Sequence, residues 1–246
     1  MSQRGLKTNE GSNTKYLAMS NGMFVQRVGK PMDFEDHEKQ KENMPANVFV
    51  RQLEKGANKG KFVHEKRFDQ FTGQLISIEK ESHDQYGDSW AFKIDVTVDE
   101  PEFLILKLPY SSGYSGNILM RLPNIKSFEN DLTFNGYNFT PKDSLKPRMG
   151  IWIAENIGDN APKVSPFYTR ETPNGLPDME EMTDPKTGKP VWSSIKRFQF
   201  LEKMVAETIL PKLKVSTSAV SPVDEPGGDV PQSEFENVGD NEELPF

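Results

Sequence analysis

The sequence predicts a mainly β protein that ends in one amphipathic helix and an acidic tail. Short apolar runs, several with two-residue alternation, follow one another between residues 68 and 156 and are separated by turn-forming residues. Asn-Gly and a Gly-rich pentapeptide divide further strand-like runs nearer the N-terminus. Beyond Lys214 the chain has no Lys or Arg, while its last 32 residues hold eight acidic side chains.

Two hairpins are expected before residue 68. The first covers residues 15–28, where Ser20-Asn21-Gly22 separates two apolar runs, and Asn and Gly both tolerate the positive φ angles of a tight turn. The second covers residues 47–68, with Gly56-Ala57-Asn58-Lys59-Gly60 as its turn. Between them, residues 30–45 are highly charged and poor in aromatic side chains, which predicts a mobile loop.

The central segment predicts five strands and one short helix. The strands are expected at residues 73–78, 90–98, 103–108, 132–139 and 148–156. Ser115 is expected to cap a helix at residues 116–122, and Pro123 is expected to stop it. Three strands, a short helix and two strands is the order of an OB-fold, a small five-stranded Greek-key barrel. We therefore expect an OB-fold-like barrel with extra N-terminal hairpins.

The last part of the β domain predicts a long loop and a helix. Residues 159–190 are rich in Pro, Gly and charge, which is typical of a loop. The helix should pack on the barrel and end at Pro211, and its apolar positions are Ile195, Phe198, Leu201, Val205 and Ile209. The chain thus divides into a flexible N-terminus (residues 1–14), a β domain (15–214) and a tail (215–246). The tail is predicted to be disordered, because an acidic segment of this kind buries too little apolar surface to offset its ordering entropy.

The composition argues against several classes of enzyme. The chain has no cysteine, which excludes disulfides, thiolate metal sites and cysteine nucleophiles. No two of its three histidines stand at a metal-ligand spacing, and the common nucleotide-binding and hydrolase motifs are absent. No apolar run reaches the ~18 residues of a membrane span, and the N-terminus has no apolar signal-peptide core. We expect a non-catalytic cytosolic protein with no metal, no cofactor and no membrane partner.

A basic stretch with interleaved aromatic residues predicts a surface for nucleic acid. Binding of single strands without sequence preference needs cations along the phosphates and aromatic faces for the bases. The cationic candidates are Arg51, Lys55, Lys59, Lys61, Lys66 and Arg67, and the aromatic candidates are Phe62, Phe68, Tyr86 and Trp90. The alternative is a solvated hairpin whose aromatic side chains turn inward, and for Phe68 and Trp90 the core is as good an interpretation as stacking.

A second candidate contact is the Gly/Ser-rich loop at residues 109–117. Free backbone N–H groups at the start of a helix favour phosphate, and Tyr110 and Tyr114 offer rings for base stacking. The alternative is an ordinary capped turn whose tyrosines cover the end of the barrel.

The last seven residues predict a partner-binding tip. They are Asp240-Asn241-Glu242-Glu243-Leu244-Pro245-Phe246. A partner can capture such a tip with a small hydrophobic pocket rimmed by Arg or Lys. The alternative is a purely solubilising acidic tail, although solubility requires no terminal aromatic residue.

Together these features resemble those of bacteriophage single-stranded DNA-binding proteins. The resemblance covers residues 15–214 and is carried by LKLPYSSGY (106–114), RLPNI (121–125), PNGLP (173–177) and FLEK (200–203). The tip resembles the acidic run and Ile-Pro-Phe that end the bacterial proteins of this class, with Leu244 in place of Ile. The resemblance implies coating of single-stranded DNA in replication, recombination and repair, in the cytoplasm of a bacterial host. It also implies that the tip recruits replication or recombination proteins.

The charge distribution agrees with this expectation. Residues 1–214 hold 29 acidic and 30 basic side chains, so this part of the chain can bind DNA only if its bases are clustered. The tail carries eight negative charges and can compete with DNA for the same cationic surface.

Two other functions are compatible with the sequence. A metal-dependent nuclease would use Asp178, Asp184 and Lys186, although Pro185 and the polar loop around them disfavour an ordered metal site. An adaptor of the replication machinery would bind protein rather than DNA through its β domain. The first hairpin either completes the barrel of its own chain or pairs with the edge of another, so the sequence allows more than one oligomeric state.

Overall fold

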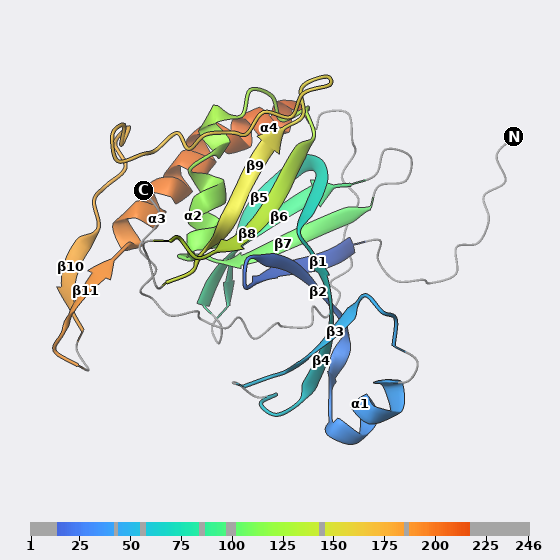
Figure 1. The fold of residues 1–246 in the computed structure, drawn as a ribbon. Coiled ribbons are helices and arrows are strands. Elements are labelled where there is room, and N and C mark those ends of the chain that lie inside the picture. The colour runs from blue at the N-terminus through green and yellow to red at the C-terminus, as the bar shows by residue number, and fades with distance from the viewer. Residues whose placement is uncertain are drawn as a thin grey trace, which may run out of the picture.

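The computed structural model describes residues 14–41, 44–54, 58–83, 87–96, 102–142, 146–184 and 187–216. The fold is mainly β, with one nine-stranded sheet that curls into a half-barrel and a few helices (Figure 1). The expected mainly β class is therefore confirmed, whereas the expected five-stranded barrel is wrong, because the curled sheet has nine strands. Within the described part of the chain, no helix is long and apolar enough to cross a membrane.

The nine strands form one continuous sheet. They are β1 (Thr14–Ser20), β2 (Met23–Met32), β3 (Val48–Gln52), β4 (Phe62–Phe68), β5 (Gln70–His83), β6 (Gly87–Asp95), β7 (Phe103–Pro109), β8 (Leu132–Phe139) and β9 (Arg148–Glu155). Their order across the sheet is β3-β4-β2-β1-β7-β6-β5-β8-β9. β1 and β7 are parallel, and all other neighbours are antiparallel. Both expected N-terminal hairpins thus form, and they extend the sheet beyond β7.

The turn between β1 and β2 is held against β8 by contact between two backbones. Asn21 and Gly22 have φ angles of 50° and 76°, as expected for Asn-Gly in a tight turn. A Cβ on Gly136 would lie 2.2 Å from the carbonyl oxygen of Gly22. Glycine at position 136 therefore lets the N-terminal hairpin dock on a strand more than 100 residues away.

A bend in β5 produces the curl of the sheet. Residues 70–73 pair with β8, whereas residues 74–83 pair with β6. At the bend, a Cβ on Gly73 would lie 2.3 Å from the carbonyl oxygen of Asp95, so only glycine fits. The strand thereby passes from one half of the sheet to the other.

The helices cover the inner face of the sheet. They are α2 (Gly113–Leu119), a 3₁₀ turn η1 (Leu122–Asn124), α3 (Ile195–Met204), a π-helical turn η2 (Val205–Ile209) and α4 (Leu210–Ser216). Phe198, Leu201 and Ile209 are buried in one core with Phe92 and Leu106 of the sheet. The expected packing of the C-terminal helix is confirmed, although Ile195 is exposed.

Three helix boundaries differ from expectation. α2 ends at Leu119 rather than at residue 122, and Pro123 lies within the 3₁₀ turn η1 instead of stopping α2. α2 begins three residues early, because Ser112 rather than Ser115 is its N-cap and accepts a hydrogen bond from the Ser115 N–H. The C-terminal helix continues through Pro211, because the π turn relieves the clash of the proline ring. There the Leu210 N–H donates to the carbonyl of Val205, five residues back.

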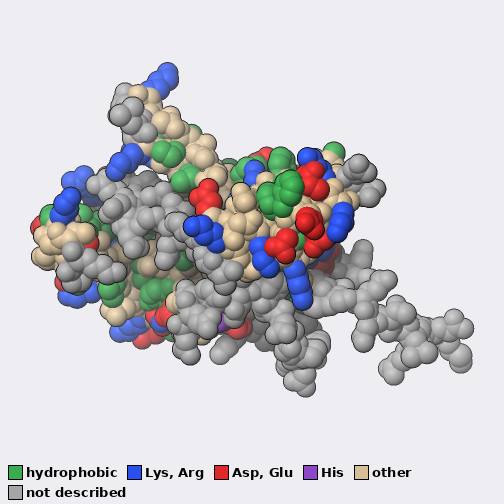
Figure 2. All heavy atoms as spheres, turned by 90° about the horizontal axis from the view of Figure 1, so that it is seen from below, with side chains coloured by type: hydrophobic (Ala, Val, Ile, Leu, Met, Phe, Trp, Pro, Cys, Tyr) green, Lys and Arg blue, Asp and Glu red, His purple; other side chains and the backbone are tan. Residues whose placement is uncertain are grey.

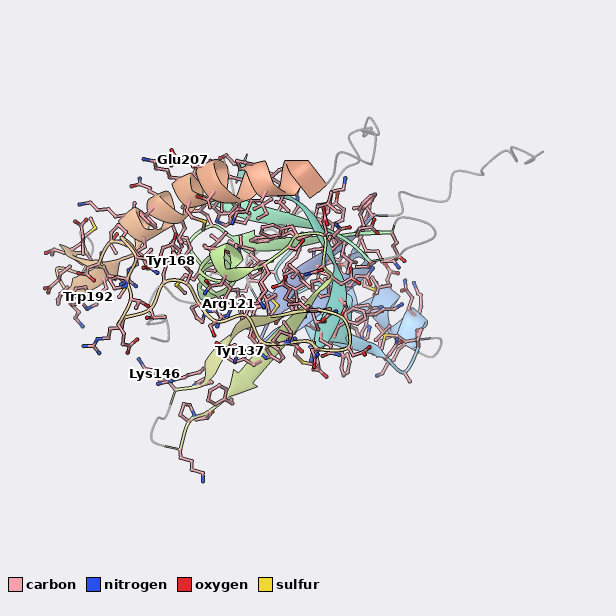
Figure 3. The ribbon with its side chains drawn as sticks, turned by 90° about the horizontal axis from the view of Figure 1, so that it is seen from above. Arg121, Tyr137, Lys146, Tyr168, Trp192 and Glu207 are labelled. Carbon is pink, nitrogen blue, oxygen red and sulfur yellow. The ribbon has the colours of Figure 1, made fainter. Side chains whose placement is uncertain are left out.

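Two segments expected as loops contain regular structure. Residues 34–41 form helix α1 (Phe34–Lys41), with acidic residues in its first turn and lysines in its last, which suits the helix dipole. Acidic and basic side chains lie close together on the surface that is seen from below (Figure 2). The segment 159–190 contributes to a hairpin of β10 (Glu180–Thr183) and β11 (Pro190–Ser193). Trp192 of this hairpin and helix α1 lie at opposite ends of the molecule (Figure 3).

Candidate nucleic-acid interface

The sheet has an inner face against the helices and an outer face away from them. Residues opposite each other in neighbouring strands share a face. Leu17, Leu106 and Phe92 stand opposite one another and are buried, which marks the inner face. The alternating residues Tyr16, Ile105 and Lys93, also opposite one another, therefore lie on the outer face.

Cations lie over aromatic rings on the outer face of β1, β6 and β7. Lys93 Nζ is 4.5 Å from the ring centroid of Phe103, and Lys107 Nζ is 5.3 Å from that of Tyr16. All four side chains are half-buried, so their stems rest on the sheet while part of each remains accessible. Lys107 also forms an ion pair with Glu81, 2.8 Å away.

The outer face continues onto an arm made of β3, β4, α1 and the second half of β2 (Figure 1). Glu65 of β4 stands opposite Phe49 of β3 and Arg27 of β2. Arg51 and Arg67 have the same parity as these residues, so they share this face. The arm therefore carries three arginines around one glutamate.

The glutamate orients two of these arginines. Glu65 is 2% exposed, and its Oε1 accepts hydrogen bonds from Arg51 Nε at 3.0 Å and Nη2 at 2.8 Å. Arg67 Nη2 lies 3.9 Å from Oε2, and Arg67 Cζ lies 4.7 Å from the ring centroid of Phe49. Phe49 is 46% exposed. A buried carboxylate thus holds two guanidinium groups beside an accessible ring.

This arrangement suits a flexible polyanion with aromatic bases. Three cation and ring pairs, Lys93 with Phe103, Lys107 with Tyr16 and Arg67 with Phe49, lie on one face of one sheet. Cations attract phosphates, and rings at the same positions offer stacking surfaces. No pair requires a particular base edge, so the surface discriminates by charge and stacking rather than by sequence.

The residues expected from the basic stretch separate onto two faces of the arm. Arg51 and Arg67 lie on the outer face, as described above. Phe62, Lys66 and Phe68 have the opposite parity on β4, and Phe62 stacks on His37 of α1 with 4.9 Å between ring centroids. Lys59 and Lys61 lie at the turn between β3 and β4. Lys55, Tyr86 and the tip residues 240–246 lie outside the described residues.

Trp90 and Tyr110 form part of the packing between sheet and helix. Trp90 is 2% exposed, which favours the core interpretation over base stacking. Tyr110 stacks on Trp90 at 5.6 Å, and its hydroxyl donates to Glu202 Oε2 at 2.6 Å. Burial, and then the Glu202 carboxylate, raise the pKa of Tyr110. Lys80 Nζ lies 4.6 Å from the ring centroid of Tyr110 and forms ion pairs with Glu202 and Asp88, so two carboxylates neutralise the cation beside this ring.

The Gly/Ser-rich loop has the contacts of a capped turn. Ser112 caps α2, and the Ser115 hydroxyl donates to the carbonyl of Pro109. The Tyr114 hydroxyl accepts a hydrogen bond from the Gly22 N–H at 3.1 Å. Tyr114 thus anchors the turn of the first hairpin.

The acidic residues of the nuclease alternative lie on or before the β10–β11 hairpin. Asp178 lies 4.0 Å from Arg197 Nη2, and Asp184 Oδ2 accepts a hydrogen bond from Thr187. Lys186 lies outside the described residues. Among the residues that are described, no group of three His, Asp or Glu side chains is arranged to hold a metal ion.

Of the six residues in the three cation and ring pairs, only Arg67 was expected from the sequence. The alternation at residues 90–98 marks Lys93 as a residue of the solvent side, although Lys93 was not among the expected site residues. Phe103 and Lys107 lie in the mostly apolar run at residues 103–108, which is typical of a short buried strand. Tyr16 and Phe49 became recognisable only when strand pairing placed them beside cations from other strands.

Comparisons of the chain with protein-family models, with curated proteins and with solved structures found no match. The function of the outer face is therefore inferred from its own chemistry.

Proposed function

We propose that this protein binds single-stranded DNA without sequence preference, through the outer face of β1, β6, β7 and the arm. The observation that carries the proposal is the set of three cation and ring pairs on one face. Each stacked base contributes roughly 1–3 kcal/mol, and each neutralised phosphate adds affinity that falls with salt. A single strand can present both its phosphates and its bases to such a face, whereas a duplex hides its bases.

The strand order supports the same proposal. β7, β6, β5, β8 and β9 are consecutive neighbours, and α2 lies between β7 and β8 in the chain. This is the sequence of elements of an OB-fold, in which the second and third strands form the oligonucleotide-binding face. Those strands correspond to β6 and β7, which carry Lys93, Phe103 and Lys107. The four remaining strands lengthen that face toward the arm.

The C-terminal residues extend the proposal to partner proteins. In this proposal the protein coats single-stranded DNA during replication, recombination or repair, and residues 240–246 recruit partner enzymes. The supporting feature is the sequence of the tip, in which acidic residues precede Leu244-Pro245-Phe246.

The proposal is tested by fluorescence anisotropy of labelled oligo(dT) of roughly 30 nucleotides against an equivalent duplex, at two salt concentrations and without metal. We expect tight, salt-sensitive binding to the single strand and weak binding to the duplex. Equal binding to the single strand and the duplex would contradict the proposal. Absence of binding to either DNA would also contradict it and would favour the protein-binding adaptor.

Two variants test whether the outer face is responsible. Lys93→Ala should weaken binding to all sequences and lower the salt slope by about 1, because one phosphate contact is lost. Phe103→Ala should weaken binding about fivefold or more through lost stacking, with little change in salt slope. Lys203→Ala is the matched control, because Lys203 lies on α3 and is 71% exposed. If Lys93→Ala, Phe103→Ala and Lys203→Ala bind oligo(dT) with equal affinity, the DNA-binding site lies elsewhere.

A further inference from the structure

Strand β3 is an open edge of the nine-stranded sheet. The opposite edge, β9, is covered by the following segment, because the Val164 N–H donates to Ile153 O at 2.8 Å and the Glu155 N–H donates to Pro162 O at 3.1 Å. Among the described residues, no strand pairs with the outer side of β3. An edge of this kind is a template for pairing with another strand.

The hydrogen bonds at the ends of β3 show which backbone groups point outward. The Leu53 N–H donates to Lys61 O across the β3–β4 pair, so the backbone groups of Leu53 face β4. Alternation along the strand then turns the N–H and C=O of Val50 and Gln52 toward the open edge. Val48 shares this parity, and its N–H bonds to Pro45 O while its C=O remains directed outward.

The open edge is complementary to itself. When two β3 strands are placed antiparallel with Val50 opposite Val50, two hydrogen bonds join the Val50 residues, and each Gln52 N–H meets the Val48 carbonyl of the second copy. The same register places Phe49 of each copy opposite Arg51 of the other copy. These are non-hydrogen-bonded positions, where side chains approach most closely. No like charges stand opposite each other in this register.

Phe49 and Arg51 are both placed to contact the second copy. Phe49 is 46% exposed and already has Arg67 4.7 Å from its ring centroid. Arg51 uses the edge of its guanidinium to bond Glu65. Its flat face is the part that stacks on a ring, so a contact with Phe49 of the second copy leaves the Glu65 bonds intact.

We propose that two copies of this chain associate through their β3 strands, as an antiparallel pair centred on Val50. The interface is isologous, so it closes as a dimer. It joins the outer faces of the two arms, with their arginines, into one surface. The proposal rests on the edge and its register, not on DNA binding, so either can fail without the other.

Sedimentation velocity of the full chain over roughly 1–100 µM tests the dimer, because this range covers micromolar association. Val50→Pro removes an outward N–H and leaves the β3–β4 ladder intact, as proline is tolerated on that side of an edge strand. Val50→Ala is the control that keeps the N–H. We expect dimers for the wild type and Val50→Ala, and monomers for Val50→Pro with an unchanged circular dichroism spectrum. A wild type that is monomeric throughout, or a Val50→Pro variant that dimerises equally, would overturn the proposal.

A cross-linking experiment tests the register without relying on proline. Because the chain has no cysteine, Val50→Cys creates a single thiol. In the proposed pair these thiols lie within reach of a short bis-maleimide, since opposite Cβ atoms are about 5 Å apart. We expect covalent dimers from Val50→Cys and almost none from Lys203→Cys on α3. Equal cross-linking of the two variants would exclude this register.

Discussion

Gly136 shows how one residue fixes a long-range contact. The backbone of β8 and the turn of the first hairpin approach so closely that a Cβ on Gly136 would overlap Gly22, at 2.2 Å from its carbonyl oxygen. Asn138 adds a hydrogen bond from its side-chain amide to Asn21 O at 3.2 Å. This contact, together with the pairing of β1 and β7, positions Tyr16 on the outer face.

Gly136→Ala should lower the free energy of unfolding by about 3 kcal/mol, at the upper end of the cost of overpacking, because backbone cannot move aside as a side chain can. Urea unfolding measures the change. Gly188→Ala is the control: Gly188 has a φ of +68° but nothing within 4 Å of the added Cβ, so we expect a loss of only about 1 kcal/mol. A Gly136→Ala variant no less stable than the control would show that the turn does not dock as described.

Helix α1 shows, at the scale of the element, how a highly charged segment becomes ordered. Ion pairs between Lys39 and Asp36 and between Lys41 and Glu38, both 3.3 Å long, support the helix locally. Its buried residue is His37, whose Nδ1 lies 3.1 Å from Nε2 of His64 on β4. One of the two rings donates and the other accepts, so this hydrogen bond requires a neutral acceptor nitrogen.

The histidine pair predicts that stability falls in acid. Burial, and then the charge of His37, lower the pKa of His64 below its usual 6.5. The unfolded chain therefore binds more protons than the folded chain at mildly acidic pH, and stability that is fully present above pH 6.5 is lost as the pH falls below it. Urea unfolding at pH 7.5 and about pH 5.5 measures the effect.

The variant His64→Gln is the control for the pH effect. Glutamine keeps a donor and an acceptor but does not titrate in this range, so the variant should depend less on pH than the wild type. If both proteins lose the same stability between the two pH values, the titrating group lies elsewhere.

At the scale of the whole molecule, charge is distributed unequally between the β domain and the C-terminal residues. Residues 1–214 are near neutral, whereas the last 32 residues carry eight acidic side chains and no basic ones. The acidic residues and DNA therefore compete for one cationic face in the proposed function.

Removal of residues 223–246 should strengthen binding to oligo(dT) at low salt and abolish recruitment of partner proteins. The gain should shrink as salt rises, because salt screens the competition between acidic residues and DNA. Anisotropy titrations of the full and truncated chains at two salt concentrations measure it. Unchanged affinity at low salt would contradict the competition.

Local features of the fold were predictable from the sequence. The Asn21-Gly22 turn, the strand at residues 132–139 and the apolar stripe from Phe198 to Ile209 depend on neighbours within a few residues, and all three were found. The site was predictable only in part. Arg51 and Arg67 were identified by their charge, but they lie on different strands, and only strand pairing reveals that they share a face.

By itself the sequence determined the mainly β class, the two N-terminal hairpins and the acidic character of the C-terminal residues, because backbone preference, two-residue periodicity and charge are local properties. The tertiary structure alone decided that β1 pairs in parallel with β7, that His37 meets His64, and that β3 becomes the open edge. These outcomes depend on pairing and close approach between segments distant in the chain. Such contacts are selected by packing and backbone hydrogen bonds, which leave no periodic signal in either segment.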